Sequence, residues 1–127
     1  MVAQDAPIPE TWATLTALVT AGNRIIFVTG RNEAQRVTTY DWLMEPMCEH
    51  RRPAQLLWKE TPRLRPMLFM RYGDLARIPS ADMKQILLEE VRSYGYDPKL
   101  AFEDRKTDTE MWRRNGLLCC QVAEGNY

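Results

Sequence analysis

Short apolar runs alternating with helical patterns constrain the fold of this chain more than any other feature. Four runs rich in apolar residues predict strands, at 24–29, 67–71, 99–103 and 117–122. Apolar residues at helical spacing predict helices between them, at 9–21, 32–44, 80–95 and from Thr107 onward. This rhythm predicts an α/β fold with a parallel sheet and helices on its faces.

Three of the predicted helices carry signals at their first residues. Asn32 and Ser80 are expected N-caps, because their side chains can accept a hydrogen bond from a backbone N–H of the first turn. Thr107 and Glu110 have the spacing of a capping box. Met83, Leu87, Val91 and Tyr94 are predicted to share the buried face of the helix that begins at Ser80.

The segment 45–66 interrupts this rhythm. It contains four prolines and the basic pair Arg51-Arg52, and no period is sustained along it. We interpret it as a Pro-rich loop or small insertion within a single domain that covers residues 1–127.

The charge balance excludes one broad class of function. The chain of 127 residues has 17 basic and 17 acidic side chains, so binding of nucleic acid or anionic membranes by bulk electrostatics is not expected. A zero net charge does not exclude binding by a local basic patch. Arginine outnumbers lysine, and its planar guanidinium suits phosphate, although a solvated surface explains the same composition.

Cysteine usage and hydropathy bear on the cellular compartment. With Cys48, Cys119 and Cys120 beside the single His50, neither a zinc site nor a disulfide framework is expected. Adjacent cysteines in a strand point to opposite faces, so small buried roles are the default for Cys119 and Cys120. No apolar stretch reaches the roughly 18 residues of a membrane helix, and the first residues lack a signal-peptide pattern, which favours the cytoplasm.

Polar residues that follow the predicted strands are the candidate site, because ligands of open α/β sheets bind beyond the carboxyl ends of strands. Thr29, Gly30 and Arg31 lie at and just after the end of the first strand, Arg71 ends the second, and Glu103 and Asp104 lie at and just after the end of the third. The first group offers an anion site at a helix N-terminus. The paired acids suit Mg²⁺.

Lys84 is the remaining candidate, since a cation in the first turn of a helix opposes the helix dipole. Each of these features alone is as readily a turn, a solvated loop or a surface charge. Together, at one edge of one sheet, they predict recognition of phosphate with Mg²⁺.

These residues carry a resemblance to a known family. The segments IIFVTGR (25–31), LFMR with Gly73-Asp74, DMK (82–84), AFEDR (101–105), MWRRNGL (111–117) and QVAEGNY (121–127) run in the same order along nearly the whole chain. With them, the sequence resembles the 3′-phosphatase domain of bacteriophage polynucleotide kinase, within the haloacid dehalogenase superfamily.

The resemblance implies roles for individual residues. Thr29, with Gly30 beside it, corresponds to the hydroxyl that binds the transferring phosphoryl group, and Lys84 to the lysine that neutralises it. Glu103 and Asp104 correspond to the acids that help to hold Mg²⁺, although Glu103 stands where the family usually has Asp. Arg31 and Arg71 are possible contacts to the substrate.

The first motif of the family, Asp-x-Asp-Gly-Thr, does not occur in these 127 residues. It supplies the aspartate nucleophile and the general acid and base, and Asp5 lacks the flanking pattern to replace it. The resemblance implies a sheet of strand order five, four, one, two, three. We therefore expect a Rossmann-like domain that lacks the usual first, central strand.

Two classes of function remain open. In the first, the chain is a degenerate, inactive phosphatase that binds phosphate, a nucleotide or a nucleic-acid end, or that regulates a partner. In the second, it is part of a split or truncated Mg²⁺-dependent polynucleotide 3′-phosphatase. In either, strand pairing within the chain, a partner chain or a homo-oligomer would fill the place of the central strand.

Overall fold

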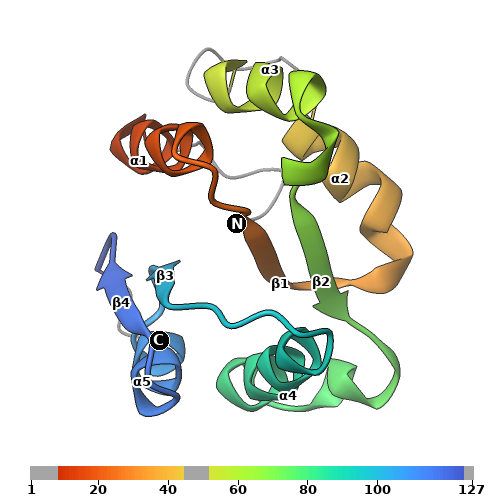
Figure 1. Ribbon diagram of the computed structural model, residues 1–127. Coiled ribbons are helices and arrows are strands. Elements are labelled where there is room, and N and C mark those ends of the chain that lie inside the picture. Colours follow the sequence, from red (N-terminus) through yellow and green to blue (C-terminus); the bar gives the residue numbers. More distant parts are fainter. Residues whose placement is uncertain (1–8, 45–51, 125–127) are drawn as a thin grey trace. The chain divides into compact units, whose positions relative to one another are not determined.

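The computed structural model describes residues 9–44 and 52–124, and its contacts divide the chain into two compact units, Met1–Met70 and Arg71–Tyr127 (Figure 1). Each unit combines helices with strands, which confirms the predicted α/β class. That the units form a single domain stays a prediction.

Unit 1 contains three α-helices and a two-stranded sheet, with two 3₁₀ turns between them. Its elements in chain order are α1 (Pro9–Thr20), β1 (Ile26–Asn32), η1 (Glu33–Gln35), α2 (Arg36–Met44), α3 (Arg52–Glu60), η2 (Pro62–Leu64) and β2 (Met67–Arg71). β1 pairs with β2, and the two arrows in Figure 1 run in the same direction.

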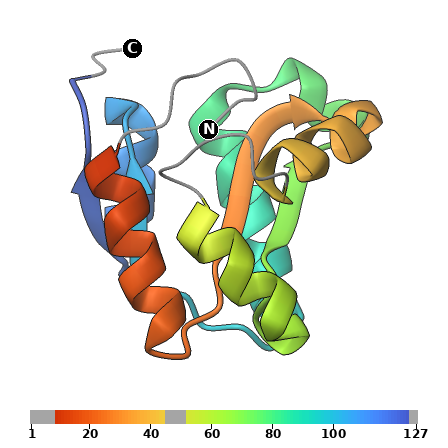
Figure 2. The ribbon, with the colours of Figure 1, turned by 90° about the horizontal axis from the view of Figure 1, so that it is seen from above.

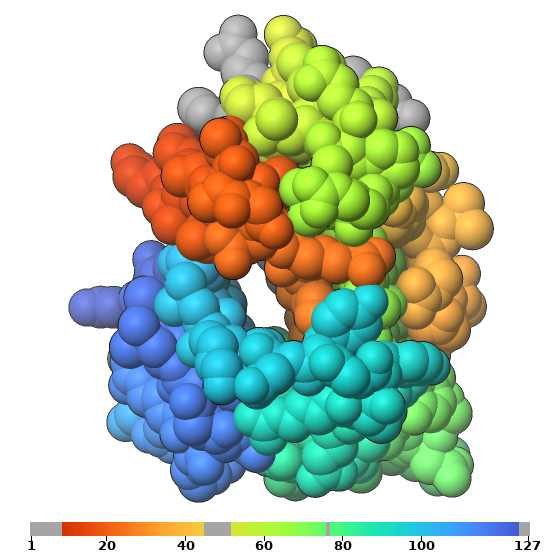
Figure 3. Space-filling view, viewed as in Figure 1, coloured from red at the N-terminus to blue at the C-terminus, as the bar shows by residue number. Residues whose placement is uncertain are grey.

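An aromatic cluster forms the core of unit 1. Trp12 from α1, Phe27 from β1 and Trp58 from α3 lie with ring centroids 6.3–6.4 Å apart, and Trp58 meets both other rings edge-on. Neither tryptophan has exposed surface. α1 and α3 consequently pack side by side, as Figures 2 and 3 show.

Helix α3 lies in the segment 45–66, which the sequence predicted to be a loop or small insertion. The prediction of a loop is wrong for Arg52–Glu60, because these residues form a helix. Pro53 is compatible with the first turn of a helix, and Ala54 and Trp58, spaced by four residues, form its buried stripe. Residues 45–51 lie outside the described part of the chain.

Strand β1 is longer than predicted. It continues through Gly30 and Arg31 to Asn32, so Thr29, Gly30 and Arg31 lie inside a strand rather than at or beyond its end. Of the glycines that the structure describes, Gly30 is not among those with a positive φ, and its backbone stays extended. Asn32 is an N-cap, as predicted: its Oδ1 accepts from the Ala34 backbone N–H at 2.8 Å, although it caps η1.

Unit 2 contains two α-helices and a second two-stranded sheet. Its elements are η3 (Gly73–Arg77), α4 (Ser80–Ser93), β3 (Leu100–Glu103), α5 (Lys106–Arg114) and β4 (Leu118–Gln121). β3 and β4 are parallel, with a register that runs from Leu100 opposite Leu118 to Glu103 opposite Gln121. α5 packs against both strands and against α4.

The buried face of α4 is largely as predicted. Met83, Leu87 and Val91 are each at most 2% exposed, but Tyr94 is 64% exposed and lies past the last turn of the helix. Cys119 is buried and its neighbour Cys120 is exposed, which confirms that they point to opposite faces of β4. The buried role predicted for Cys120 is therefore wrong, since its side chain lies on the exposed face.

Two predicted caps are wrong. Ser80 is the first residue of α4, and its hydroxyl donates to the side chain of Asp108 instead of capping the helix. Thr107 lies inside α5, whose N-cap position is Arg105, and no side chain caps that helix. A tertiary partner therefore displaces the local interaction of Ser80. Cys48 lies outside the described residues.

The strands form two small sheets rather than the single one predicted. In the described part of the chain, β1 pairs only with β2, and β3 only with β4. Both pairs are neighbours in the strand order that the family resemblance implies. Among the helices of this part, none is long and apolar enough to cross a membrane.

Replacing Trp58 by alanine tests the aromatic core. We expect the free energy of unfolding to fall by about 3–5 kcal/mol, the usual cost of removing a fully buried tryptophan. The control is Leu56→Ala on the same helix, where the side chain is 50% exposed and a loss below about 1 kcal/mol is expected. Urea denaturation measures both, and equal losses would contradict this account of the core.

Candidate functional site

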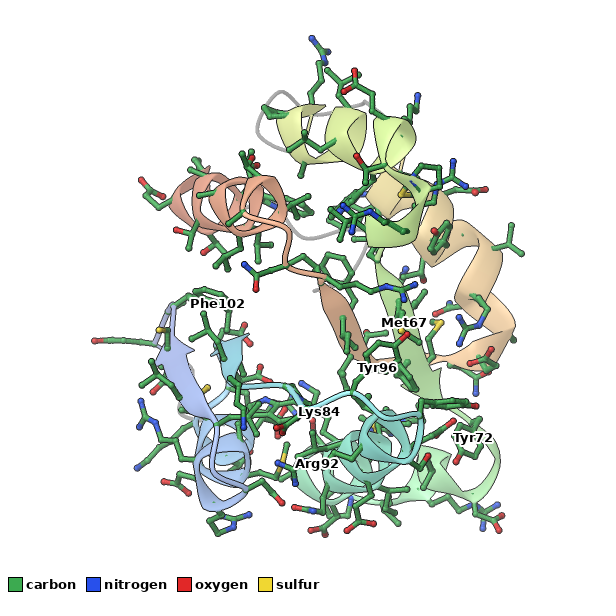
Figure 4. All side chains as sticks on the ribbon, viewed as in Figure 1. Met67, Tyr72, Lys84, Arg92, Tyr96 and Phe102 are labelled. Atoms are coloured by element: carbon green, nitrogen blue, oxygen red, sulfur yellow. The ribbon has the colours of Figure 1, made fainter. Side chains whose placement is uncertain are left out.

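Lys84 is a largely buried cation. It lies on α4 and its side chain, 12% exposed, reaches toward β3 and α5 (Figure 4). Its Nζ lies 2.9 Å from Glu103 Oε1 and 2.8 Å from Asp108 Oδ2. We call these three residues the Lys84 cluster. Lys84 is thus not a surface charge, which was the alternative explanation of its place in the helix.

The electrostatics of the cluster favour charged lysine. Burial alone lowers the pKa of Lys84, but the charges of Glu103 and Asp108, and its hydrogen bonds to both, outweigh burial, so the pKa is raised above its ordinary value. Two acceptors in the described chain use two of the three ammonium hydrogens. One hydrogen is left for a further acceptor.

The carboxylate of Glu103 is held by four donors. Its Oε1 accepts from Lys84 Nζ at 2.9 Å and from the Trp112 indole at 3.1 Å. Its Oε2 accepts from the backbone N–H groups of Asp104 and Arg105, at 3.1 and 3.4 Å. The last residue of β3 is therefore locked to α4, to α5 and to the loop that follows it.

Asp108 is the functional residue that sequence reasoning missed. It has no exposed surface, and it accepts a hydrogen bond from Ser80 Oγ at 2.7 Å in addition to its contact with Lys84. In the sequence it is an acidic residue in the first turn of a helix, which the helix dipole explains without a partner. The only further signal is its spacing of five residues after Glu103.

The cluster does not fit a metal ion in this arrangement. The four donors on Glu103 occupy all the lone-pair positions of its carboxylate, while Asp104 is exposed. Among the described residues, no three acidic, histidine or cysteine side chains are grouped to hold a metal. The predicted Mg²⁺ site at Glu103 and Asp104 stays a prediction, and no step is derived through it.

The residues predicted to form an anion site in unit 1 are engaged with each other. Thr29 is 4% exposed, and its hydroxyl accepts from the backbone N–H of Arg31 at 3.2 Å. The Arg31 guanidinium donates to the hydroxyl of Thr39 at 3.3 Å. Since the strand continues past Thr29 and Asn32 caps the turn that follows, the predicted helix N-terminus is absent at this point of the described chain.

The structure thus brings together only part of the predicted site. Lys84 and Glu103 are in contact within unit 2, and Asp104 follows them in the loop. Thr29, Gly30 and Arg31 form a second group in unit 1. Arg71 is the half-buried last residue of β2.

Paired parallel strands, a buried lysine from a helix and an acidic pair at the end of a strand define a phosphatase-like α/β domain of the haloacid dehalogenase type. The model of one family, described as the polynucleotide kinase PNKP phosphatase domain, matches residues 1–127. The chain belongs to this family. Phosphatases of the superfamily generally use Mg²⁺.

Replacing Lys84 by methionine tests the charge balance of the cluster. We expect the free energy of unfolding to fall by about 3–5 kcal/mol at neutral pH, because two buried carboxylates lose their cation. Urea unfolding at neutral pH measures the loss.

Lys99→Met is the matched control, since Lys99 pairs with Asp97 at the surface, where both side chains are more than two-thirds exposed. It should change stability little. In the wild type, the stability from Lys84 is present below about pH 10.4 and is lost as the pH rises through its raised pKa. A loss in Lys84→Met no larger than that in Lys99→Met would contradict the charge balance.

Proposed function

We propose that this chain binds a phosphomonoester, of the kind found at the 3′ end of a nucleic acid, without hydrolysing it by its own residues. Membership of the polynucleotide kinase phosphatase family supports phosphate as the ligand. The observation that carries the proposal is the Lys84 ammonium, fixed by two carboxylates and with one hydrogen left for an acceptor.

The chemistry of the ammonium suits this role. A hydrogen bond from a charged donor to a phosphate oxygen is shorter and stronger than one between neutral groups. Glu103 and Asp108 hold the donor in place before the ligand arrives, so little side-chain entropy is lost on binding.

Turnover requires a group that these residues do not supply. Phosphoryl transfer in the superfamily passes through an aspartate nucleophile, and the 127 residues contain no Asp-x-Asp-Gly-Thr sequence. Asp5 lies outside the described residues. The acids of the Lys84 cluster are already paired with the ammonium, which makes them poor nucleophiles.

Phosphate binding is tested by calorimetry with inorganic phosphate and with a 3′-phosphorylated nucleotide. Lys84→Ala should weaken binding at least tenfold, because a hydrogen bond to a charged group contributes about 1.5–3 kcal/mol. The exposed Lys106 offers a control: Lys106→Ala should bind as the wild type does.

Because Lys84→Ala also weakens the fold, the wild type provides a second readout. Phosphate should shift the NMR signals of the Lys84 Nζ and Cε atoms more than those of Lys106. Unshifted Lys84 signals at saturating phosphate would rule out this binding site.

Hydrolysis is measured with p-nitrophenyl phosphate and a 3′-phosphorylated oligonucleotide in the presence of Mg²⁺. No rate above background is expected from these residues alone. A rate that persists in Asp5→Asn would show that the chain contains a nucleophile elsewhere.

An alternative function is favoured by the strand pairing. β1 and β3 each pair with one strand in the described chain, which leaves backbone N–H and C=O groups along their second edges. A strand from a partner chain or a second copy can pair there. If that strand carries an Asp-x-Asp-Gly-Thr sequence, the assembly is a split polynucleotide 3′-phosphatase.

A peptide that contains this motif after an apolar strand separates the two functions. In the split enzyme, the peptide and Mg²⁺ together produce hydrolysis, and a peptide with Asn in place of its first Asp does not. Sedimentation of the chain alone reveals whether a second copy already occupies the edges, in which case a dimer is found.

A further inference from the structure

Helix α3 and the turn η2 carry a concentration of positive charge that the proposed phosphate site does not use. Residues 52–65 contain four basic side chains and one acidic side chain, Glu60, in a chain whose total charge is zero. This segment lies within the stretch whose role the sequence left open.

A hydrogen bond from its side chain to a backbone carbonyl places a fifth cation, Arg24, beside this segment. The Arg24 Nε–H donates to the carbonyl of Arg65 at 3.0 Å, across 41 residues of sequence. The Arg65 Nε–H donates in turn to the carbonyl of Trp58 at 3.4 Å. Lys59 follows Trp58 in the last turn of α3, so these cations gather around the C-terminal end of that helix.

We call this surface the α3–η2 basic patch, and its members at the end of the helix are Arg24, Lys59, Arg63 and Arg65. All four are exposed. Part of this arrangement serves the fold, because cations near a helix C-terminus complement its dipole. One arginine on a carbonyl meets that need, and the further cations beside it raise the local positive charge.

We infer that the α3–η2 basic patch binds the phosphodiester backbone of a nucleic-acid strand. Guanidinium groups match phosphate oxygens in geometry, and a row of phosphates is the ligand that relieves several neighbouring cations at once. The choice of nucleic acid rests on the proposed function, since the family acts on polynucleotide ends.

An anionic membrane is the less suitable partner. A helix that binds a membrane surface inserts its apolar face among the lipids. The apolar residues Ala54 and Trp58 of α3 are fully buried, and the helix packs against α1. Leu56 is the one large apolar side chain of the described α3 that is at least half exposed.

The test measures binding of a fluorescent 12-nucleotide DNA strand without a terminal phosphate, by anisotropy over a range of salt concentrations. The variant Lys59→Gln with Arg63→Gln removes two charges from exposed side chains of the patch. We expect roughly tenfold weaker binding at low salt. The dependence on salt should become less steep, by about 0.7 for each phosphate that the variant no longer neutralises.

The control is Arg77→Gln with Arg114→Gln, which removes the same charge from exposed positions of unit 2. It should bind within about twofold of the wild type. An equal loss of affinity in both variants would show that only the net charge of the protein matters, and it would overturn the inference. The inference would also be overturned if the wild type did not bind the DNA strand, or if it bound anionic phosphatidylserine vesicles instead of DNA.

A second strand with a 3′-phosphate separates this inference from the proposed function. The gain in affinity from the terminal phosphate should vanish in Lys84→Ala and persist in Lys59→Gln with Arg63→Gln. No gain in the wild type would refute the phosphate site alone, while loss of strand binding only in Lys84→Ala would refute the basic patch alone.

Discussion

The contact of Lys84 with two buried carboxylates determines the structure of the second unit. An ammonium group in an apolar interior is costly unless its charge is matched and its hydrogens are accepted. Glu103 and Asp108 provide both, and they come from the end of β3 and the first turn of α5, while Lys84 comes from α4. The cation therefore fixes three elements relative to one another, and Ser80 and Trp112 hold the two carboxylates in turn.

In the first unit, the corresponding constraint is apolar. The rings of Trp12, Phe27 and Trp58 join two helices to a strand, and they leave the ends of α3 exposed to solvent. Burial of this kind is non-directional, so it fixes the helices without using their charged residues. The cations at the end of α3 are then exposed to solvent, whereas the Lys84 ammonium is held by two carboxylates and has one hydrogen left for a ligand.

Much of this organisation is predictable from the sequence, for reasons that the particular elements illustrate. The four strands and the helices α1 and α4 were found because apolar periodicity depends on neighbours a few residues away. Helix α3 was missed because Pro53 and the prolines on either side of the helix obscured a short buried stripe. The hydroxyl of Ser80 was predicted to cap a helix, whereas its partner is 28 residues distant.

The residues of the candidate site also divide into those that the nearby sequence predicts and those that depend on distant partners. Lys84 was singled out because a cation near the start of a helix is locally unfavourable, and that conflict is resolved only by distant residues. Asp108 is locally favourable where it stands, so nothing in the nearby sequence distinguishes it. Thr29 and Gly30 were placed at and just after the end of a strand, but extended backbone continues through them to Asn32.

The position of Glu103 connects the charge balance with the question of metal. Its longer side chain, in place of the usual Asp of the family, reaches the ammonium of Lys84 and the indole of Trp112 while its second oxygen still accepts from the backbone. A divalent cation could take Oε1 only by displacing one of the two donors that this oxygen already has, Lys84 or Trp112. Displacing Lys84 would leave the ammonium with Asp108 alone, whereas displacing Trp112 would leave a buried indole N–H without this acceptor. Either loss opposes metal coordination by this oxygen.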